Sequence, residues 1–245
     1  MGAPRGTSAA ELPGHPSHAA GAGSPSIGLR ALLIALTGVT GLVDAASYLG
    51  VGHVFVANMT GNVVLLGFAL SGAAGLSIAA SAVALGAFLL GAVAGGRLGV
   101  ATSQRRRLWL ATASAAQTAL VGAAAAATAA GVLRPDGPSR LPLLAVLGIA
   151  MGIQNATARR LAIPDLTTTV LTQTLTGLAA DSPLAGGPNP RPVRRITAVG
   201  TMLGGALVGG ALTLHAGLSL SLAVAALALA LVTLCFAAGV GTKDT

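Results

Sequence analysis

The sequence predicts an all-α membrane protein, a polytopic helical bundle with an internal duplication. Hydrophobic residues make up 53% of the 245 residues and charged residues only 8%, and the mean hydropathy is +0.81. A soluble domain carries about 25% charged residues, so this chain cannot cover a water-facing surface. Its apolar segments are also too long for outer-membrane strands, which need roughly ten alternating residues.

The N-terminal residues 1–27 differ from the rest of the chain. They are rich in Gly, Ala, Pro and Ser and contain no apolar run that could serve as a signal peptide or an anchor. We expect a disordered cytoplasmic tail here, followed by a single transmembrane domain over residues 28–240.

Eight apolar segments follow the tail. They cover residues of about 30–50, 54–72, 77–99, 108–131, 141–158, 166–180, 196–214 and 217–239. A membrane span needs about 20 residues, and segments 54–72 and 166–180 are the shortest and most polar. We therefore expect about six spanning helices plus two short polar segments that re-enter or are broken; seven or eight spans remain an alternative.

The arginines favour the six-span arrangement. If all eight segments span, Lys and Arg divide almost equally between the two sides. If the two short segments enter and leave on one side, only Arg134 and Arg140 of the 14 basic residues fall outside. This satisfies the positive-inside rule and places the tail, the loop at Arg105–Arg107 and the loop at Arg191–Arg195 in the cytoplasm.

A repeat relates the two halves, about 30–131 and 141–239. Four glycines recur 114 positions later, Gly41 and Asp44 match Gly152 and Asn155 at 111, and Thr60 matches Thr172 at 112. The glycines are Gly86, Gly91, Gly95 and Gly96, with copies at Gly200, Gly205, Gly209 and Gly210. Three spans per half would orient the halves oppositely, as in inverted-repeat transporters, and the small-residue spacing predicts a helix-packing face.

Asp44 is the acidic residue of the first long apolar segment, and Tyr48 lies one turn away on the same helical face. Ionisable side chains at such depth usually face a bundle interior or a cavity, which indicates a cation or proton site. The alternative is a carboxyl group that serves packing alone. The matching position in the second half is Asn155, preceded by Gln154, so two copies of the site would carry one charge.

The two short segments supply the other candidate binding residues. Asn58 is a favoured N-cap for a helix that starts at Met59, and Thr60 and Asn62 follow it. In the second half, Asp165 after Pro164 could cap a helix on which Thr169, Thr172 and Thr176 share one face. We expect these segments to meet Asp44, Gln154 and Asn155 near the bilayer midplane. The alternative for the threonines is a hydroxyl bonded to the carbonyl one turn earlier.

Several classes of function lack support in the sequence. No hydrolase, metalloprotease, CxxC or P-loop motif is present, so we expect no enzyme activity, cofactor or metal site. The formal net charge of +8 fits cytoplasmic loops of a membrane protein, and we expect no nucleic-acid partner. The expected partners are the lipid bilayer and an unknown small solute or ion; a homo-oligomer remains open.

Two blocks carry a resemblance to a known family. They read TGLVDAASYLGVGHVFVANMTGNVVLLGFAL and GIQNATARRLAIPDLTTTVLTQTLTGLAAD. They resemble the signature blocks of the YoaK-like family of bacterial multipass inner-membrane proteins, built on a domain of unknown function. The resemblance covers nearly all of residues 30–240 and implies an integral protein of the cytoplasmic membrane. It implies no established substrate.

These observations lead to one main functional hypothesis, a small-solute permease or secondary transporter with a midplane site between two repeats. The rival is a membrane sensor or scaffold that transports nothing, and a lipid-modifying enzyme comes third. A cavity lined by Asp44 and the two polar segments would favour transport. A solid, glycine-packed interior would favour the scaffold.

Overall fold

The computed structural model describes residues 26–161, 171–189 and 191–242, and this part of the chain is helical. Six long helices have the length and hydropathy needed to cross a membrane, which confirms the predicted fold class. They are α1 (Ile27–Gly50), α3 (Ile78–Ala101), α4 (Arg106–Ala129), α5 (Arg140–Leu161), α7 (Pro192–Ala216) and α8 (Leu218–Ala237). The shorter elements are α2 (Met59–Leu70), α6 (Leu171–Ala180) and the 3-10 turn η2 (Pro183–Ala185).

Local sequence explains where several helices begin. The Ser26 and Ser77 hydroxyls accept hydrogen bonds from the N–H groups of Leu29 and Ala80, so they cap α1 and α3. Pro192 occupies the first position of α7, where its missing N–H has no cost.

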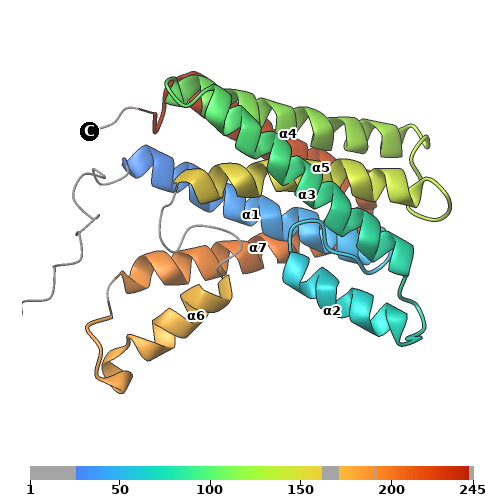
Figure 1. Ribbon diagram of the computed structural model, residues 1–245, viewed down its shortest axis with the longest axis horizontal. Coiled ribbons are helices and arrows are strands. Elements are labelled where there is room, and N and C mark those ends of the chain that lie inside the picture. Colours follow the sequence, from blue (N-terminus) through green and yellow to red (C-terminus); the bar gives the residue numbers. More distant parts are fainter. Residues whose placement is uncertain (1–25, 162–170, 190, 243–245) are drawn as a thin grey trace, which may run out of the picture.

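The two short helices lie along one side of the bundle (Figure 1). α2 packs against α3, and α6 packs against α7. Each begins near the middle of the bundle, but α2 runs to the end where α3 starts and α6 to the opposite end, where α7 starts (Figure 1). Each short segment thus leaves on its own side of the bundle. Asp165, which was expected to cap the helix of this segment, and Pro164 before it lie outside the described part of the chain.

Helix packing rests on glycines at two matching interfaces. α1 packs along α7, and a Cβ atom at Gly41 would overlap the carbonyl oxygen of Met202. α5 packs along α3, and a Cβ atom at Gly152 would overlap the carbonyl oxygen of Phe88. Backbones at such close approach leave no room for a side chain. Gly152 lies 111 positions after Gly41, and Met202 lies 114 positions after Phe88, the offsets found in the sequence repeat.

The other helix contacts also occur in matching pairs. α8 packs on α1 as α4 packs on α5, and the α2–α3 contact has its counterpart in α6–α7. α4 and α8, the last helices of the two halves, pack on each other.

The four glycines that recur in the sequence have less uniform surroundings than their spacing suggests. Gly91, Gly95, Gly205 and Gly209 meet a neighbouring backbone, whereas Gly86, Gly96 and Gly200 have no atom within 4 Å of an added Cβ.

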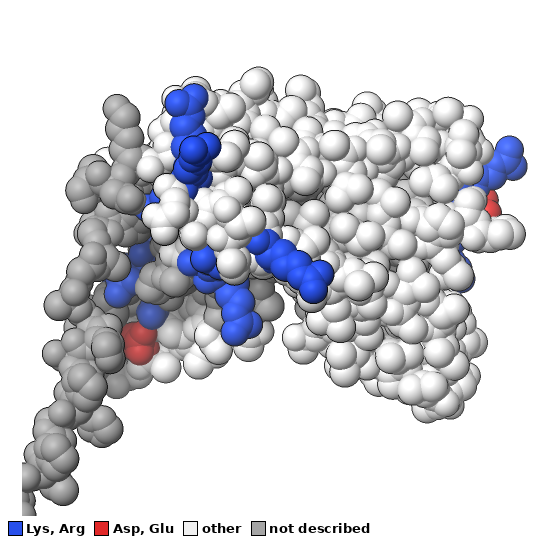
Figure 2. Space-filling view, turned by 45° about the horizontal axis from the view of Figure 1, so that its top comes forward, with Lys and Arg blue, Asp and Glu red and all other residues white. Residues whose placement is uncertain are grey.

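The charged side chains gather at one end of the bundle, at the left in Figure 2. We call this the arginine-rich end: every described arginine lies there except Arg134, in the α4–α5 connection, and Arg140, the first residue of α5, both at the other end. The arginine-rich end includes the start of α1, the α3–α4 loop and the end of α5. Apart from Arg140, the arginines of α1, α3, α4, α5 and α7 therefore lie on a single side.

The neighbouring glycines Gly204 and Gly205 offer a direct test of the packing. Gly205→Ala should destabilise the protein by about 1–3 kcal/mol, because the added methyl group overlaps the carbonyl oxygen of Gly38. Gly204→Ala should be neutral or stabilising, because a Cβ at Gly204 meets no atom within 4 Å and alanine favours helix by up to about 1 kcal/mol. Thermal unfolding in detergent compares the two variants. Equal stability would show that α1 and α7 do not pack this closely.

Candidate functional site

The chain that follows α1 folds back along the helix it has just left. The turn uses two residues with positive φ, Gly52 (107°) and His53 (60°). The returning backbone then reaches Asp44, whose Oδ1 accepts hydrogen bonds from the N–H groups of Val56 (2.9 Å) and Ala57 (2.8 Å). Since Asp44 precedes the end of α1 by six residues, the returning segment reaches about 9 Å into the bundle. Asp44 fixes it at that depth.

Asn62 holds the same segment from the α2 side. Its Oδ1 accepts a hydrogen bond from the Phe55 N–H (2.9 Å), and its Nδ2 donates to the Phe55 carbonyl oxygen (2.6 Å). The side chain of Asn62 is fully buried. The Phe55 ring stacks on Tyr48 at 4.8 Å between centroids, and His53 meets Tyr48 edge-on at 5.3 Å. The end of α1, the returning segment and α2 therefore form one unit.

Asn58 caps α2 as the sequence predicted. Its Oδ1 accepts a hydrogen bond from the Gly61 N–H (3.2 Å), and the helix begins at Met59. The start of a helix carries a partial positive charge and backbone N–H groups without helical partners. In this protein that start lies at the depth of Asp44, which brings a carboxylate and a helix N-terminus together.

A cavity of about 530 Å³ opens where these elements meet α6 and α7. Thr40, Asp44 and Tyr48 line it from a single face of α1, and Asn58 and Thr60 line it from the start of α2. Thr172 lines it from the first turn of α6, and Met202 from α7. We call this space the central cavity. Its remaining lining is largely apolar: Phe55, Ala57, Met59, Gly61, Val64, Leu65 and Leu171.

The structure separates the predicted site residues into three groups. Asp44, Tyr48, Asn58, Thr60 and Thr172 line the central cavity together. Asn62 is buried behind the cavity wall, where it holds the returning backbone. Thr176 is exposed on α6 and does not belong to the described cavity lining, and Thr169 lies outside the described residues.

Gln154 and Asn155 are buried elsewhere on α5, and Gln154 lies in the core between α1, α4 and α5. Gln154 donates from Nε2 to the Thr40 hydroxyl at 2.7 Å, so it reaches the central cavity only through Thr40. Asn155 is also buried and donates from Nδ2 to the Met151 carbonyl oxygen at 2.9 Å. Neither residue belongs to the described lining of the central cavity.

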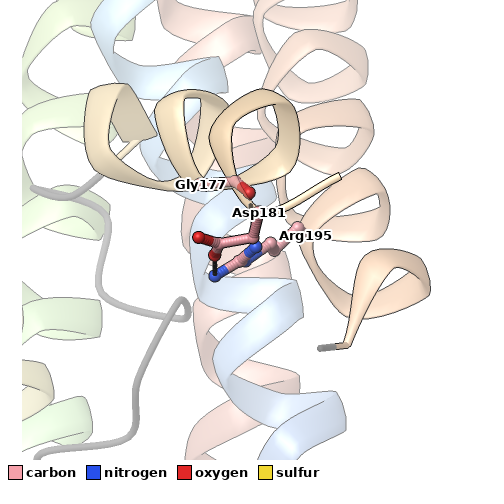
Figure 3. Close-up of polar contacts among 3 residues, drawn as sticks. All are labelled: Gly177, Asp181 and Arg195. Carbon is pink, nitrogen blue, oxygen red and sulfur yellow. Dashed lines mark hydrogen bonds and ion pairs between the residues drawn. The ribbon is translucent and has the colours of Figure 1, made fainter. Parts of the chain in front are cut away.

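An ion pair holds the far end of α6 (Figure 3). Arg195 on α7 pairs its Nη2 with the Asp181 carboxylate at 2.8 Å and donates from Nη1 to the Gly177 carbonyl oxygen at 2.7 Å. Arg195 is largely buried, so the pair fastens α6 to α7 at the arginine-rich end. The first half carries Ala69 and Ser81 at the equivalent positions, 112 and 114 residues earlier, and both are uncharged.

From the sequence, Arg195 was expected only to contribute to membrane topology, and Thr40 and Phe55 were not among the predicted site residues. Thr40 could have been found, because it lies four residues before Asp44 and eight before Tyr48, on one helical face. Asp181, the acidic residue directly after α6, was a weaker indication that Arg195 forms an ion pair there. Nothing in the spacing of Phe55 indicates that its backbone is held by Asn62.

The chemistry of the central cavity depends on one carboxylate and several neutral polar groups. Asp44 is the charged residue among the described lining, and hydroxyl or amide groups of Thr40, Tyr48, Asn58, Thr60 and Thr172 surround the space. Such a set can hold a cation beside the carboxylate and hydrogen-bond a small polar solute. Among the described residues, no three His, Cys, Asp or Glu side chains lie together in a group that could hold a metal ion.

Comparison with known proteins agrees with a transmembrane bundle. The profile of a family described as "Protein of unknown function (DUF1275)" matches residues 32–235. The chain is 35% identical over 154 residues to "UPF0700 transmembrane protein YoaK" of Bacillus subtilis (strain 168). That match spans 61% of this chain and 65% of the relative, just under two thirds of its length. No solved structure matches the chain.

The returning segment should depend strongly on Asn62. Asn62→Leu removes both hydrogen bonds to Phe55 and leaves the part-buried N–H and carbonyl of Phe55 unpaired, at up to about 1–3 kcal/mol for each group. Asn58→Ala removes an exposed cap and should cost only about 1 kcal/mol. Unfolding in detergent measures both variants. A loss no larger for Asn62→Leu than for Asn58→Ala would contradict the assigned role of Asn62.

Proposed function

Since the chain belongs to the family of proteins of unknown function DUF1275, we propose, on the basis of its cavity, that it is a small-solute permease or secondary transporter. The solute site is the central cavity, between the two halves of the bundle. Asp44 binds a proton or another cation there, and the hydroxyls of Thr60 and Thr172 contact the solute. The protein works in the cytoplasmic membrane of a bacterium, without enzyme activity.

The observation that carries this proposal is the meeting of α1, α2 and α6 at one space. Asp44, Thr60 and Thr172 come from three separate segments and line a cavity of about 530 Å³, within the usual size range of small-molecule sites. Polar groups at this depth are costly unless they face protein or a cavity. A packed interior at this position would instead have favoured a scaffold.

The matching helix contacts support alternating access. The α1–α7 and α3–α5 interfaces use equivalent glycines, and α2 and α6 leave toward opposite ends of the bundle. Two halves of opposite orientation around one site are the plan of many secondary transporters, in which one half rocks against the other. In this proposal the halves arose by duplication, and the central cavity opens to each side in turn.

The arginine-rich end faces the cytoplasm in this proposal. Arginines in short loops orient a membrane protein with those loops inside, and the described arginines of the opposite end are Arg134 and Arg140 alone. This orientation also places the N-terminus inside, because α1 begins at the arginine-rich end.

The second candidate is a sensor or scaffold that moves no solute. It is favoured by the backbone contacts of Gly41, Gly152 and Gly205, which hold the long helices rigidly, and by the two hydrogen bonds that Asp44 accepts. In that case Asp44 anchors the returning segment and carries no ion. The two candidate functions predict different outcomes for a variant that removes the charge of Asp44 and keeps its hydrogen bonds to Val56 and Ala57.

Asp44→Asn makes that distinction. The amide oxygen can still accept the Val56 and Ala57 N–H groups, and Asn already occupies the equivalent position 155, so the protein should fold and reach the membrane. Transport coupled to a proton or cation should be abolished. Untargeted metabolite profiles of cells with the wild type, Asp44→Asn or no gene measure the effect.

The Asp44→Asn profile should match that of the deletion strain at an equal level of membrane-inserted protein. Asp136→Asn, in the α4–α5 connection, serves as the control and should match the wild type. A wild-type profile for Asp44→Asn would refute the cation role, and identical profiles for wild type and deletion would refute transport.

The proposed orientation has its own test. In a Cys235→Ala background, Ser103→Cys in the α3–α4 loop should resist a membrane-impermeant thiol reagent applied outside the cell. Ser139→Cys, in the α4–α5 connection, should react with it. The reverse pattern would show that the arginine-rich end faces outward.

A further inference from the structure

A row of buried polar side chains connects α1, α5 and α4 next to the central cavity. Gln154 on α5 donates from Nε2 to the Thr40 hydroxyl at 2.7 Å, and its Oε1 accepts a hydrogen bond from Nε2 of Gln117 on α4. Gln117 is 1% exposed and Gln154 is 4% exposed. Amide side chains buried in a membrane bundle are rare unless they have polar partners, so this row requires an explanation.

The row borders a second, much smaller cavity. Its volume is about 10 Å³, and Ser114, Gln117, Gln154 and Thr157 supply its polar lining. The rest of the wall is apolar: Leu33, Leu36, Leu110, Ala113, Ala158, Leu161 and Phe236. A space of about this size and polarity holds one water molecule. Leu33, Leu110 and Leu161 lie near the helix ends that form the arginine-rich end, which faces the inside of the cell in the proposed orientation. We therefore call this space the inner cavity.

The polar groups of the inner cavity have hydrogen-bonding capacity to spare. Within the described part of the chain, neither the Ser114 hydroxyl nor Oε1 of Gln117 has a hydrogen-bond partner. Both side chains are more than nine-tenths buried. Neither atom is among the fully enclosed polar atoms that lack a partner in the described chain, so both face accessible space, where a water molecule between them would satisfy both. No charged side chain lines the inner cavity, so water fits it better than an ion.

The equivalent positions in the other half of the bundle are apolar. At the offset of 111 residues, Val43 corresponds to Gln154 and Met151 corresponds to Thr40. Aligning the starts of α4 and α8 makes Leu229 correspond to Gln117. Val43, Met151 and Leu229 are all fully buried, and the Met151 sulfur lies 3.8 Å from Nε2 of Gln117, at the edge of the row. The row of polar side chains therefore has apolar residues at its equivalent positions in the other half.

We infer that Gln154 separates two connected water sites, and that water reaches the central cavity from the arginine-rich end through the inner cavity. Gln154 lines the inner cavity and also bonds to Thr40, which lines the central cavity. Rotation of its amide away from Thr40 opens the connection. This route supplies water, and with it protons, to Asp44, so its use rests on the proposed function. The route itself exists whether or not a solute is transported.

Thiol accessibility tests the route in the full-length protein, inserted in vesicles of both orientations. In a Cys235→Ala background, Thr40→Cys should react with Ag⁺, an impermeant thiol-reactive ion about as small as a water molecule, applied from the arginine-rich side. Adding Gln154→Leu should slow that reaction at least about tenfold, because a buried water that loses a hydrogen-bonding partner loses about that factor in occupancy. Ser114→Cys lies before Gln154 on the route, and its reaction should be unaffected by Gln154→Leu.

Val43→Cys, at the apolar and fully buried position equivalent to Gln154, is the control and should stay unreactive from both sides. The inference is wrong if Gln154→Leu leaves the labelling of Thr40→Cys unchanged. It is equally wrong if Val43→Cys reacts as fast as Thr40→Cys, or if Ser114→Cys does not react. Should Thr40→Cys fail to fold, an unreactive Ser114→Cys alone would overturn the proposal. Labelling as expected, without any change in metabolite profiles on deletion, would refute transport and leave the water route standing.

Discussion

The structure depends on how backbone N–H and carbonyl groups find hydrogen-bond partners where the chain runs through the bundle without forming a helix. Irregular backbone at membrane depth must find partners inside the protein, because acyl chains offer none. The Asp44 carboxylate and the Asn62 amide supply those partners for the segment between α1 and α2, using four hydrogen bonds to backbone groups of Phe55, Val56 and Ala57. With those bonds in place, α2 can start in mid-bundle, and its start can face a cavity.

Glycine provides the second condition for this architecture. The central helices α1 and α5 each lie against a helix of the opposite half, at distances that leave no room for Cβ atoms at Gly41 or Gly152. Close backbone contact replaces the hydrophobic effect, which gives no driving force between helices in lipid. The short helices are held differently in the two halves. α6 has the ion pair between Arg195 and Asp181, whereas α2 has uncharged residues at those positions.

The fold was largely predictable, because hydropathy and arginine placement depend on each segment separately. The long apolar runs predicted six spanning helices, and the polarity of segments 54–72 and 166–180 separated them from the rest. The start of α2 at Met59 followed from its capping residue Asn58. The prediction was less complete for contacts between helices. The bond between Gln154 and Thr40, and the fastening of α6 by Arg195, join residues distant in sequence, and only their packing shows which polar groups meet.

The residues that line the central cavity also differ in how well the sequence predicted them. Asp44, Tyr48, Asn58 and Thr60 lie within one stretch of sequence, and their common location could be anticipated from it. Thr172, which matches Thr60 at an offset of 112 residues, lines the same space from the other half of the chain. Met202 had no such signal, and Thr40 had only its helical spacing from Asp44. Asn62, which was predicted to be a binding residue, instead supports the cavity wall from behind.

Tyr48 is the single tyrosine of the chain, and it lies on the wall of the central cavity, stacked on Phe55 and in contact with His53. Its near-ultraviolet absorbance and its phenol resonance therefore arise from one known location. Trp109, the single tryptophan, lies at the first turn of α4, beneath the Arg160 guanidinium at 5.7 Å from its ring centroid. The protein thus carries one aromatic reporter in its cavity and another, distinguished by its indole resonance, at the arginine-rich end, without any chemical label.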